Sequence, residues 1–137
     1  MAKAKPLSEA HIQGTCTAWL ALDGWRCVRT DMPHLRGLGV SEPGMADNLY
    51  IRYCGASSKS QWPLDSALTV VRADVMWIEW KKRGGKARQH QQDWHAEERA
   101  IGALTLIAGQ SFPASIEGFC SWYAGSGLQR KRISIPR

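Results

Sequence analysis

The chain has 137 residues, of which 44% are hydrophobic and 22% are charged. This size and composition are typical of one globular domain with a single core, and the apolar runs are too short to span a bilayer. The net charge of +6 at pH 7 favours a polyanionic partner such as nucleic acid, although it fits equally well a basic protein without one. No apolar signal segment follows the basic residues 1–6, so we expect an intracellular, cytoplasmic protein.

The four cysteines favour neither a zinc site nor a disulfide framework. None belongs to a C-x-x-C pair, and each lies in an apolar segment. We therefore expect free, buried thiols in a reducing compartment. The cysteines are Cys16, Cys27, Cys54 and Cys120.

The first predicted element is a helix over residues 7–22. Ser8 is a suitable N-cap, and Asp23-Gly24 ends the helix. An apolar stripe recurs at helical spacing and predicts the face that packs on the core. The stripe consists of Ile12, Cys16, Trp19 and Leu20.

Two short strands are predicted next, over residues 25–29 and 48–53. The loop 31–46 between them is rich in proline and glycine. Residues 54–66 are small and polar and read as a loop or insertion, in which Trp62 is a candidate for stacking on an exposed base. The run 67–71 is apolar but has no obvious pairing partner.

The second half of the chain alternates strands and helices. In its first helix we expect Trp94 and Ala100 to face inward and Gly102 to end the helix, while Trp19 and Trp77 join Trp94 in the core. The elements are strand 75–80, helix 89–101, strand 103–108, helix 115–124 and a tail over 125–137. The whole order predicts one α/β (α+β) domain over residues 1–137, with a small central mixed β-sheet flanked by helices.

The most informative segment is Glu79-Trp80-Lys81, at the end of the strand 75–80. Side chains two residues apart point to the same face of a strand, so a carboxylate and an ammonium lie together on a strand that reads as buried. Buried strands rarely carry two charges on one face without a use for them. The strand then leads into the basic, glycine-broken loop 82–86.

These residue types suit metal-dependent phosphodiester hydrolysis. Such a site holds a divalent cation with one or two carboxylates and places a lysine near the attacking water. Asp47 stands at the start of the strand 48–53, and Glu79 and Lys81 share a face of the next one. The main-chain carbonyl of Trp80 is a candidate neutral ligand, and Gln91 is a candidate hydrogen-bond donor to the site or to a phosphate.

Glu9 extends the apolar stripe of the first helix by one turn, which places its carboxylate along the inward face. An acidic residue in a first turn is also stabilised by the helix dipole without any further role. Spacing alone favours this second interpretation by roughly two to one.

Several short motifs occur in a fixed order along the chain. They are Glu9, Gly44-Met45-Ala46-Asp47, Glu79-Trp80-Lys81, Gly84-Gly85-Lys86, Gln91 and Trp94-His95. Over about residues 8–124 this pattern resembles the virus-type replication-repair nuclease (VRR-NUC) domain of the PD-(D/E)xK nuclease superfamily. The chain departs from that pattern at Ala46, where members often have proline, and at Trp80, where a small β-branched residue is usual.

The resemblance implies a restriction-endonuclease-like core and a Mg²⁺ or Mn²⁺ cofactor. Lys81 would be the catalytic amine and Gln91 the helix glutamine of the family. The implied metal ligands are Asp47, Glu79 and the Trp80 carbonyl, with Glu9 contributing through a water molecule. With the resemblance, the functional interpretation of Glu9 becomes the favoured one.

Four cations follow the candidate catalytic strand and are candidate DNA phosphate contacts, favoured about two to one over a merely solvated face. They are Lys82, Arg83, Lys86 and Arg88. A second basic cluster occupies residues 129–132. No nucleotide-binding glycine motif occurs, so no nucleotide cofactor is expected.

The function expected first is a structure-specific endonuclease of DNA repair that acts on branched DNA, similar to a Holliday-junction resolvase. Symmetric cutting of two strands favours a homodimer. Two alternatives stay open. One is a nuclease of the same chemistry that acts on flaps, ends or other DNA, and the other is a DNA-binding module that does not cleave.

Overall fold

The computed structural model describes residues 4–30, 42–54 and 72–136, without the side chains of Cys54 and Arg72. Its helices and strands follow one another in the predicted order. They are α1 (Glu9–Leu22), β1 (Arg26–Arg29), β2 (Asn48–Cys54), β3 (Arg72–Glu79), α2 (Gln89–Ala100), β4 (Leu104–Ile107) and α3 (Ile116–Gly125). The predictions for residues 55–71, including Trp62, and for most of the loop 31–46 fall outside the described residues, whereas residue 54, where we expected the loop to begin, is the last residue of β2.

The four described strands form one sheet in the order β1-β2-β3-β4. β2 pairs antiparallel with both β1 and β3, whereas β4 pairs parallel with β3. A parallel pair needs a crossover connection, and α2 provides it between β3 and β4. The sheet is therefore mixed, as the sequence predicted.

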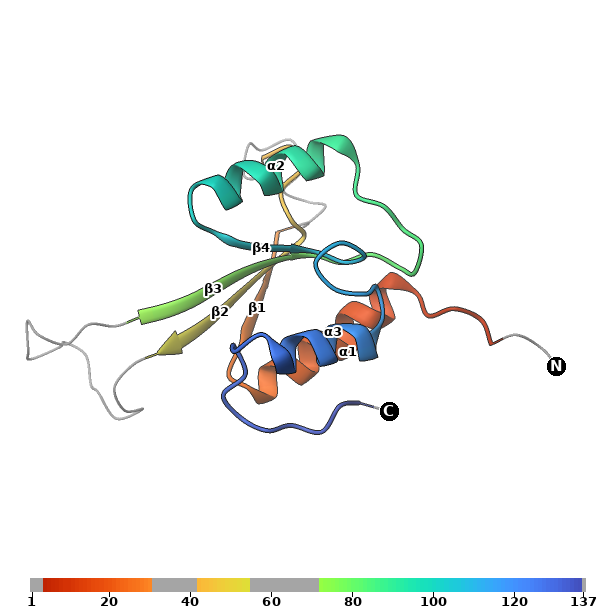
Figure 1. Ribbon diagram of the computed structural model, residues 1–137, viewed down its shortest axis with the longest axis vertical. Coiled ribbons are helices and arrows are strands. Elements are labelled where there is room, and N and C mark those ends of the chain that lie inside the picture. The colour runs from red at the N-terminus through yellow and green to blue at the C-terminus, as the bar shows by residue number, and fades with distance from the viewer. Residues whose placement is uncertain (1–3, 31–41, 55–71, 137) are drawn as a thin grey trace, which may run out of the picture.

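Helices cover both faces of the sheet (Figure 1). α2 lies on one face, and α1 and α3 lie side by side on the other. The main core is on the α1–α3 side, because every second residue of the central strands points there. Its strand residues include Tyr50, Met76, Ile78 and Leu106, with Trp80 directly after β3. On the α2 side, the Trp77 and Trp94 rings meet edge to face with centroids 5.2 Å apart.

The cap, the end and the apolar stripe predicted for α1 are confirmed, while the helix begins at Glu9, two residues after the predicted start. Ser8 caps the helix, since its Oγ accepts the His11 N–H at 3.2 Å, and Asp23 is the C-cap. The four residues of the predicted stripe are the buried residues of this helix. The apolar face of α1 therefore packs on the sheet and on α3.

β3 begins at Arg72, three residues before the predicted start. The apolar run does not reveal this extension, because its residues are polar or small. Here β3 pairs with the end of β2, and Arg52 forms an ion pair of 2.7 Å with Asp74. At this end of β3, a cross-strand ion pair takes the place of the apolar side chains that mark the rest of the strand.

The inward face of α2 was predicted only in part. Trp94 is buried, and so is His95. Ala100 is exposed, so its predicted inward position is wrong. At 3.6 residues per turn, Ala100 lies about 240° around the axis from Trp94, which turns it towards solvent. Gly102 follows the C-cap with a positive φ of 96°, in keeping with its predicted role as helix terminator.

Among the described side chains, the thiols of Cys16 and Cys120 are buried and free, and the thiol of Cys27, which donates to Asn48 Oδ1, is half-buried. Trp77 is also half-buried, although we expected it in the core. It lies on the sheet face that the single helix α2 covers, whereas two helices cover the other face.

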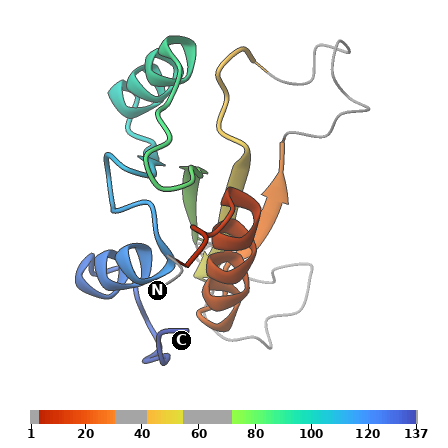
Figure 2. The ribbon, with the colours of Figure 1, turned by 90° about the vertical axis from the view of Figure 1, so that its right-hand side faces the viewer.

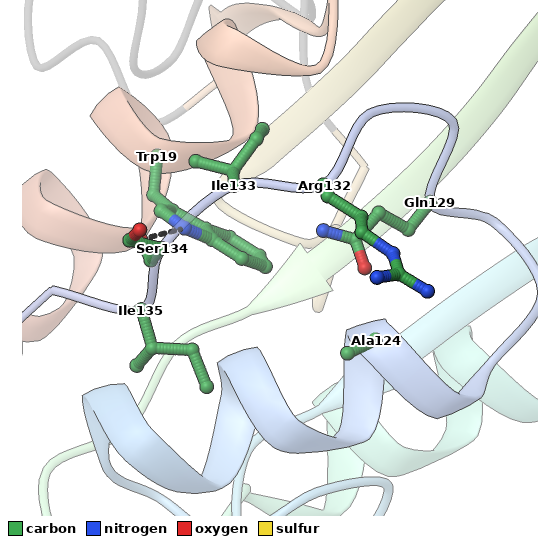
Figure 3. Close-up of a pocket in the computed structure, with 7 residues that line it drawn as sticks. All are labelled: Trp19, Ala124, Gln129, Arg132, Ile133, Ser134 and Ile135. Carbon is green, nitrogen blue, oxygen red and sulfur yellow. Dashed lines mark hydrogen bonds between the residues drawn. The ribbon is translucent and has the colours of Figure 1, made fainter.

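The segment after α3 returns across α1 and is part of the fold. Asp23 accepts the main-chain N–H of Lys131 at 2.8 Å, and the Trp19 indole donates to the Ser134 carbonyl at 3.0 Å. Figure 3 shows the Trp19 contact at the edge of a cavity of about 310 Å³, which Arg132 and Ile135 also line. The predicted tail is therefore anchored at several points.

In the described part of the chain, every helix is too short or too polar to cross a membrane.

Candidate active site

The predicted site residues gather at one end of the sheet. β2 and β3 run antiparallel, so the end of β3 lies beside the beginning of β2, where Asn48 pairs with Ile78. One residue further along both strands, Asp47 stands opposite Glu79. α2 begins close to this same end, because the loop 80–88 that follows β3 leads directly into it.

Asp47 and Glu79 also share a face of the sheet. Strand side chains alternate between faces, and Asn48 points towards α1, where the Gln13 amide donates to its Oδ1 at 3.2 Å. Asp47 and Glu79 therefore point to the opposite face, the one covered by α2. The proximity of the two carboxylates is felt electrostatically, since Asp47 raises the pKa of Glu79.

Glu79, Lys81 and Gln91 form a closed triangle of contacts. The Lys81 ammonium lies 2.8 Å from Glu79 Oε1 and donates to Gln91 Oε1 at 3.2 Å. The Gln91 amide donates in turn to Glu79 Oε1 at 2.6 Å. The structure thus brings together three residues that are 2 to 12 positions apart in the chain.

Gln91 is held in place from a second direction. Its Oε1 accepts the main-chain N–H of Arg88, the N-cap of α2, at 2.9 Å. This is the reciprocal half of a capping box, so the same side chain ends the helix and reaches the site. The beginning of α2 therefore fixes where the Lys81 and Glu79 side chains meet.

The Glu79 carboxylate is asymmetric. Oε1 has two side-chain partners, whereas Oε2 is buried and has no hydrogen-bond partner among the described residues. Burial, and after it the charge of Asp47, raise the pKa of Glu79 above its ordinary value, although Lys81 and the main-chain N–H of Asp47 oppose the change. A buried carboxylate oxygen without a partner raises the free energy of the folded state, and a bound cation or proton would remove this penalty.

Position 44, three residues before Asp47, requires a glycine. Its φ is +82°, and a Cβ at this position would lie 2.1 Å from the carbonyl oxygen of His90 in the first turn of α2. The neighbouring Glu42 carboxylate accepts the Trp94 indole N–H at 2.9 Å. The segment 42–47 therefore packs directly on α2, and this contact sets the position of Asp47.

The other side of this segment is tied to the residue that follows β1. The main-chain N–H of Thr30 donates to the Asp47 carbonyl at 2.9 Å, and its hydroxyl donates to the carbonyl of Ala46. Ala46 itself is fully buried. Proline at position 46 would leave both contacts to carbonyls intact.

The Trp80 side chain belongs to the core, because the residue after Glu79 points to the opposite face. It is fully buried, its indole donates to the Tyr50 hydroxyl at 2.9 Å, and its ring packs on Phe112 and Phe119. The Trp80 carbonyl accepts no hydrogen bond from the described residues. A bulky ring here is compatible with a free carbonyl beside Glu79.

The structure does not bring Glu9 into the triangle. Glu9 lies half-buried in the first turn of α1, and its carboxylate forms no hydrogen bond or ion pair with a described residue. One turn later, Gln13 contacts Asn48, the residue next to Asp47. The start of α1 is thus near the site, but a direct contact of Glu9 with it is not present.

The described residues contain no group of three or more His, Cys, Asp or Glu side chains placed to hold a metal ion. Asp47 and Glu79 supply two carboxylates. Mg²⁺ typically uses one or two carboxylates and completes its octahedron with waters and substrate phosphate oxygens. The unpartnered Glu79 Oε2 and the free Trp80 carbonyl are hard oxygen donors of the kind that such an ion prefers.

The four predicted phosphate contacts are all exposed. They lie on the loop 80–88, whose turn is tight: the Gly85 N–H donates to the Lys82 carbonyl at 2.8 Å, and Gly84 has a φ of +78°. The cations therefore stand in solvent beside the Glu79–Lys81–Gln91 triangle. They are Lys82, Arg83, Lys86 and Arg88.

The sequence reasoning missed the pair Gln13 and Asn48. Asn48 is fully buried, its Oδ1 also accepts from the Cys27 thiol at 3.4 Å, and its Nδ2 has no partner among the described residues. A polar residue directly after Asp47 at the start of an apolar strand was the available signal. The pair joins α1 to the beginning of β2 and so supports the position of Asp47.

Comparisons of this chain with family models, with curated proteins and with solved structures find no match.

Proposed function

We propose that this protein is a metal-dependent endonuclease that hydrolyses phosphodiester bonds in DNA. The observation that carries the proposal is the Glu79 carboxylate, which is buried with one oxygen bound to Lys81 and Gln91 and the other without a partner. A second carboxylate, Asp47, stands opposite it. An acid pair beside a lysine can hold a divalent cation and place positive charge next to a phosphate, which suits metal-dependent phosphodiester hydrolysis.

In this proposal Asp47, Glu79 and the carbonyl of Trp80 hold Mg²⁺ or Mn²⁺. The cation would supply positive charge to the phosphate and lower the pKa of the attacking water. Lys81 donates hydrogen bonds that orient the water and share the negative charge of the phosphate oxygens. Gln91 keeps the Lys81 ammonium beside the Glu79 carboxylate, which fixes the direction of attack. Glu9 contributes through a water molecule.

The preferred substrate in this proposal is branched DNA inside the cell. The exposed cations of the loop 80–88 bind the backbone on the outer side of the site. Because the chain offers one such cluster among its described residues, symmetric cutting of a four-way junction requires a two-fold dimer. The alternatives are cleavage of flaps or ends with the same chemistry and binding without cleavage.

The decisive experiment measures cleavage of labelled four-way junction, flap and plain duplex DNA with Mg²⁺, with Mn²⁺ and with EDTA. Lys81→Ala is expected to reduce cleavage by about 100-fold or more while junction binding persists. Lys131→Ala removes the same charge at the far end of α1 and is the matched control. Full activity of the Lys81 variant would refute the nuclease assignment, and binding without any cleavage by wild type would favour the DNA-binding module.

A further inference from the structure

A groove of about 260 Å³ lies beside the loop 80–88. Three parts of the chain that are distant in sequence form it: the segment 4–7 before α1, the loop residue Arg83, and Ala114 and Ser115 before α3. Ile12 of α1 lies at its base. In Figure 2 the N-terminal segment leads into α1 near the start of α3, in keeping with the residues that line the groove.

The lining of the groove combines cations with apolar surface. Lys5 and Arg83 are its charged residues, and both are exposed. Pro6, Leu7 and Ile12 contribute apolar walls. Among the described residues, no carboxylate lines the groove, although α1 and α3 each carry an acid in the first turn. Cations above an apolar wall match a phosphate joined to a deoxyribose.

The groove lies close to the candidate active site. Arg83 follows Lys81 by two residues, so their Cα atoms are at most about 7 Å apart along the chain. A DNA strand advances about 3.4 Å along the helix axis per nucleotide. A strand whose phosphate meets Lys81 therefore reaches the groove within a few nucleotides.

We propose that this groove binds one backbone phosphate and its deoxyribose, a few nucleotides from the bond that is cut, through Lys5 and Arg83. The inference rests on the proposed nuclease function and extends it, because it makes the N-terminal segment part of the DNA-binding surface. Two cations from separate segments that hold one phosphate fix the register of the strand relative to Glu79 and Lys81.

The cavity beside Trp19 does not fit the same role (Figure 3). Trp19 is ten residues along α1 from Glu9, which is about 15 Å at the helical rise. Its lining contains one cation, Arg132, next to apolar residues. The basic residues of that region therefore provide controls that carry the same charge at a distance from the groove.

The first test compares Lys5→Ala and Arg83→Ala with Lys131→Ala. Binding of an uncleaved four-way junction is measured in EDTA across a salt series. Each groove variant is expected to lower affinity several-fold and to reduce the slope of log K against log salt by about 0.9. Lys131→Ala is expected to match wild type. Equal effects of the three substitutions would overturn the proposal.

The second test locates the phosphate. Single methylphosphonate substitutions, which remove one backbone charge at a time, are placed at successive positions near the cut. Wild type should lose affinity at one position within a few nucleotides of the cut, and Lys5→Ala and Arg83→Ala should be insensitive at that same position. Sensitivity that persists in both variants would overturn the proposal, since another group would then hold that phosphate.

The outcomes separate the groove from the nuclease assignment. If wild type cleaves, Lys81→Ala does not, and Lys5→Ala behaves as Lys131→Ala does, the groove proposal fails and the nuclease stands. If wild type neither binds nor cleaves DNA, both fail. The side chains of Lys5, Arg83 and Lys131 are exposed, and unchanged thermal unfolding of the groove variants confirms that the comparison reports binding.

Discussion

Gly44 and His90 are in backbone contact: a Cβ at Gly44 would lie 2.1 Å from the His90 carbonyl oxygen. The contact joins the segment before β2 to the first turn of α2. Asp47 lies three residues after Gly44, and Gln91 directly follows His90. The contact at Gly44 therefore sets the distance between Asp47 and Gln91, the residue that orients the Glu79 carboxylate.

Replacing Gly44 with alanine should destabilise the protein and displace Asp47. The positive φ costs an alanine about 1–3 kcal/mol, and the clash with His90 adds to this cost. Gly14→Ala is the matched control, because Gly14 is exposed in α1 with no atom near its Cβ. That change should stabilise by about 0.5–1 kcal/mol. Urea unfolding measures both, and equal stabilities of the two variants would contradict the packing described here.

Glu79→Gln should abolish cleavage and leave the fold at least as stable as wild type at pH 7. Burial and Asp47 raise the pKa of Glu79 in the folded state, so ionisation of this side chain opposes folding. The advantage of the glutamine should grow as the pH rises through 4.5, the ordinary value for a glutamate. Thermal unfolding between pH 4 and pH 8 checks this. A glutamine variant that is less stable than wild type across the whole range would refute it.

His95 should make the protein lose stability in mild acid. Burial, followed by the charges of Arg99 and Lys81, lowers the pKa of His95 to about 4. In the unfolded chain the pKa is about 6.5, so the unfolded state gains a proton first as the pH falls. The stability is complete above pH 6.5 and is lost towards pH 4, by up to about 3 kcal/mol.

Urea unfolding of wild type and His95→Gln at several pH values tests this expectation. The variant loses the hydrogen bond with Thr105 and should be less stable at pH 7. Its stability should nevertheless change less than that of wild type between pH 6.5 and pH 4. Parallel pH profiles would show that His95 does not cause the acid sensitivity.

Asp23→Asn should release the C-terminal segment. The Asp23 carboxylate accepts hydrogen bonds from the Arg130 and Lys131 main chain and pairs with the buried Arg52 at 3.0 Å. Removing one partner of a buried ion pair costs about 3–5 kcal/mol when the other charge is left uncompensated, and because Asp74 still pairs with Arg52 we expect a smaller loss here. Trypsin should then cut near Arg132 faster than in wild type, whereas Glu117→Gln, a change at an exposed residue of α3, should leave the digestion unchanged.

The pKa of Asp23 gives the same network a pH signature. Burial on its own raises this pKa, but hydrogen bonds from Tyr123, Arg130 and Lys131 and the charge of Arg52 outweigh burial and lower it. The stability from Asp23 is therefore present above its ordinary value of 3.8 and is lost as the pH falls through the lower folded value.

Local sequence patterns were sufficient to predict the elements whose signal lies within a few residues of the chain. Ser8 and the stripe of α1 follow from capping and helical spacing, and the shared face of Glu79 and Lys81 follows from strand alternation. The prediction that Ala100 faces inward was wrong because the buried face of α2 contains Trp94 and His95, and a buried histidine was not expected.

The features that the sequence did not reveal depend on partners far along the chain. Arg52 is buried between Asp23 and Asp74, and its Cζ atom lies 4.5 Å from the Trp25 ring centre. No local rule pairs residues so distant. The proximity of Glu79, Lys81 and Gln91 could be predicted from the sequence because the three residues lie within one strand–loop–helix unit.

The anchoring of the C-terminal segment has a consequence for the order of folding. Trp25 meets Tyr123 across 98 residues, Asp23 meets Lys131 across 108, and Trp19 meets Ser134 across 115. Contacts between such distant residues close late, because the chain between them must be ordered first. The end of α1 therefore stays uncovered until residues 123–134 have been synthesised, and until then Trp19 and the nearby Trp25, both buried in the folded protein, are exposed to solvent in the nascent chain.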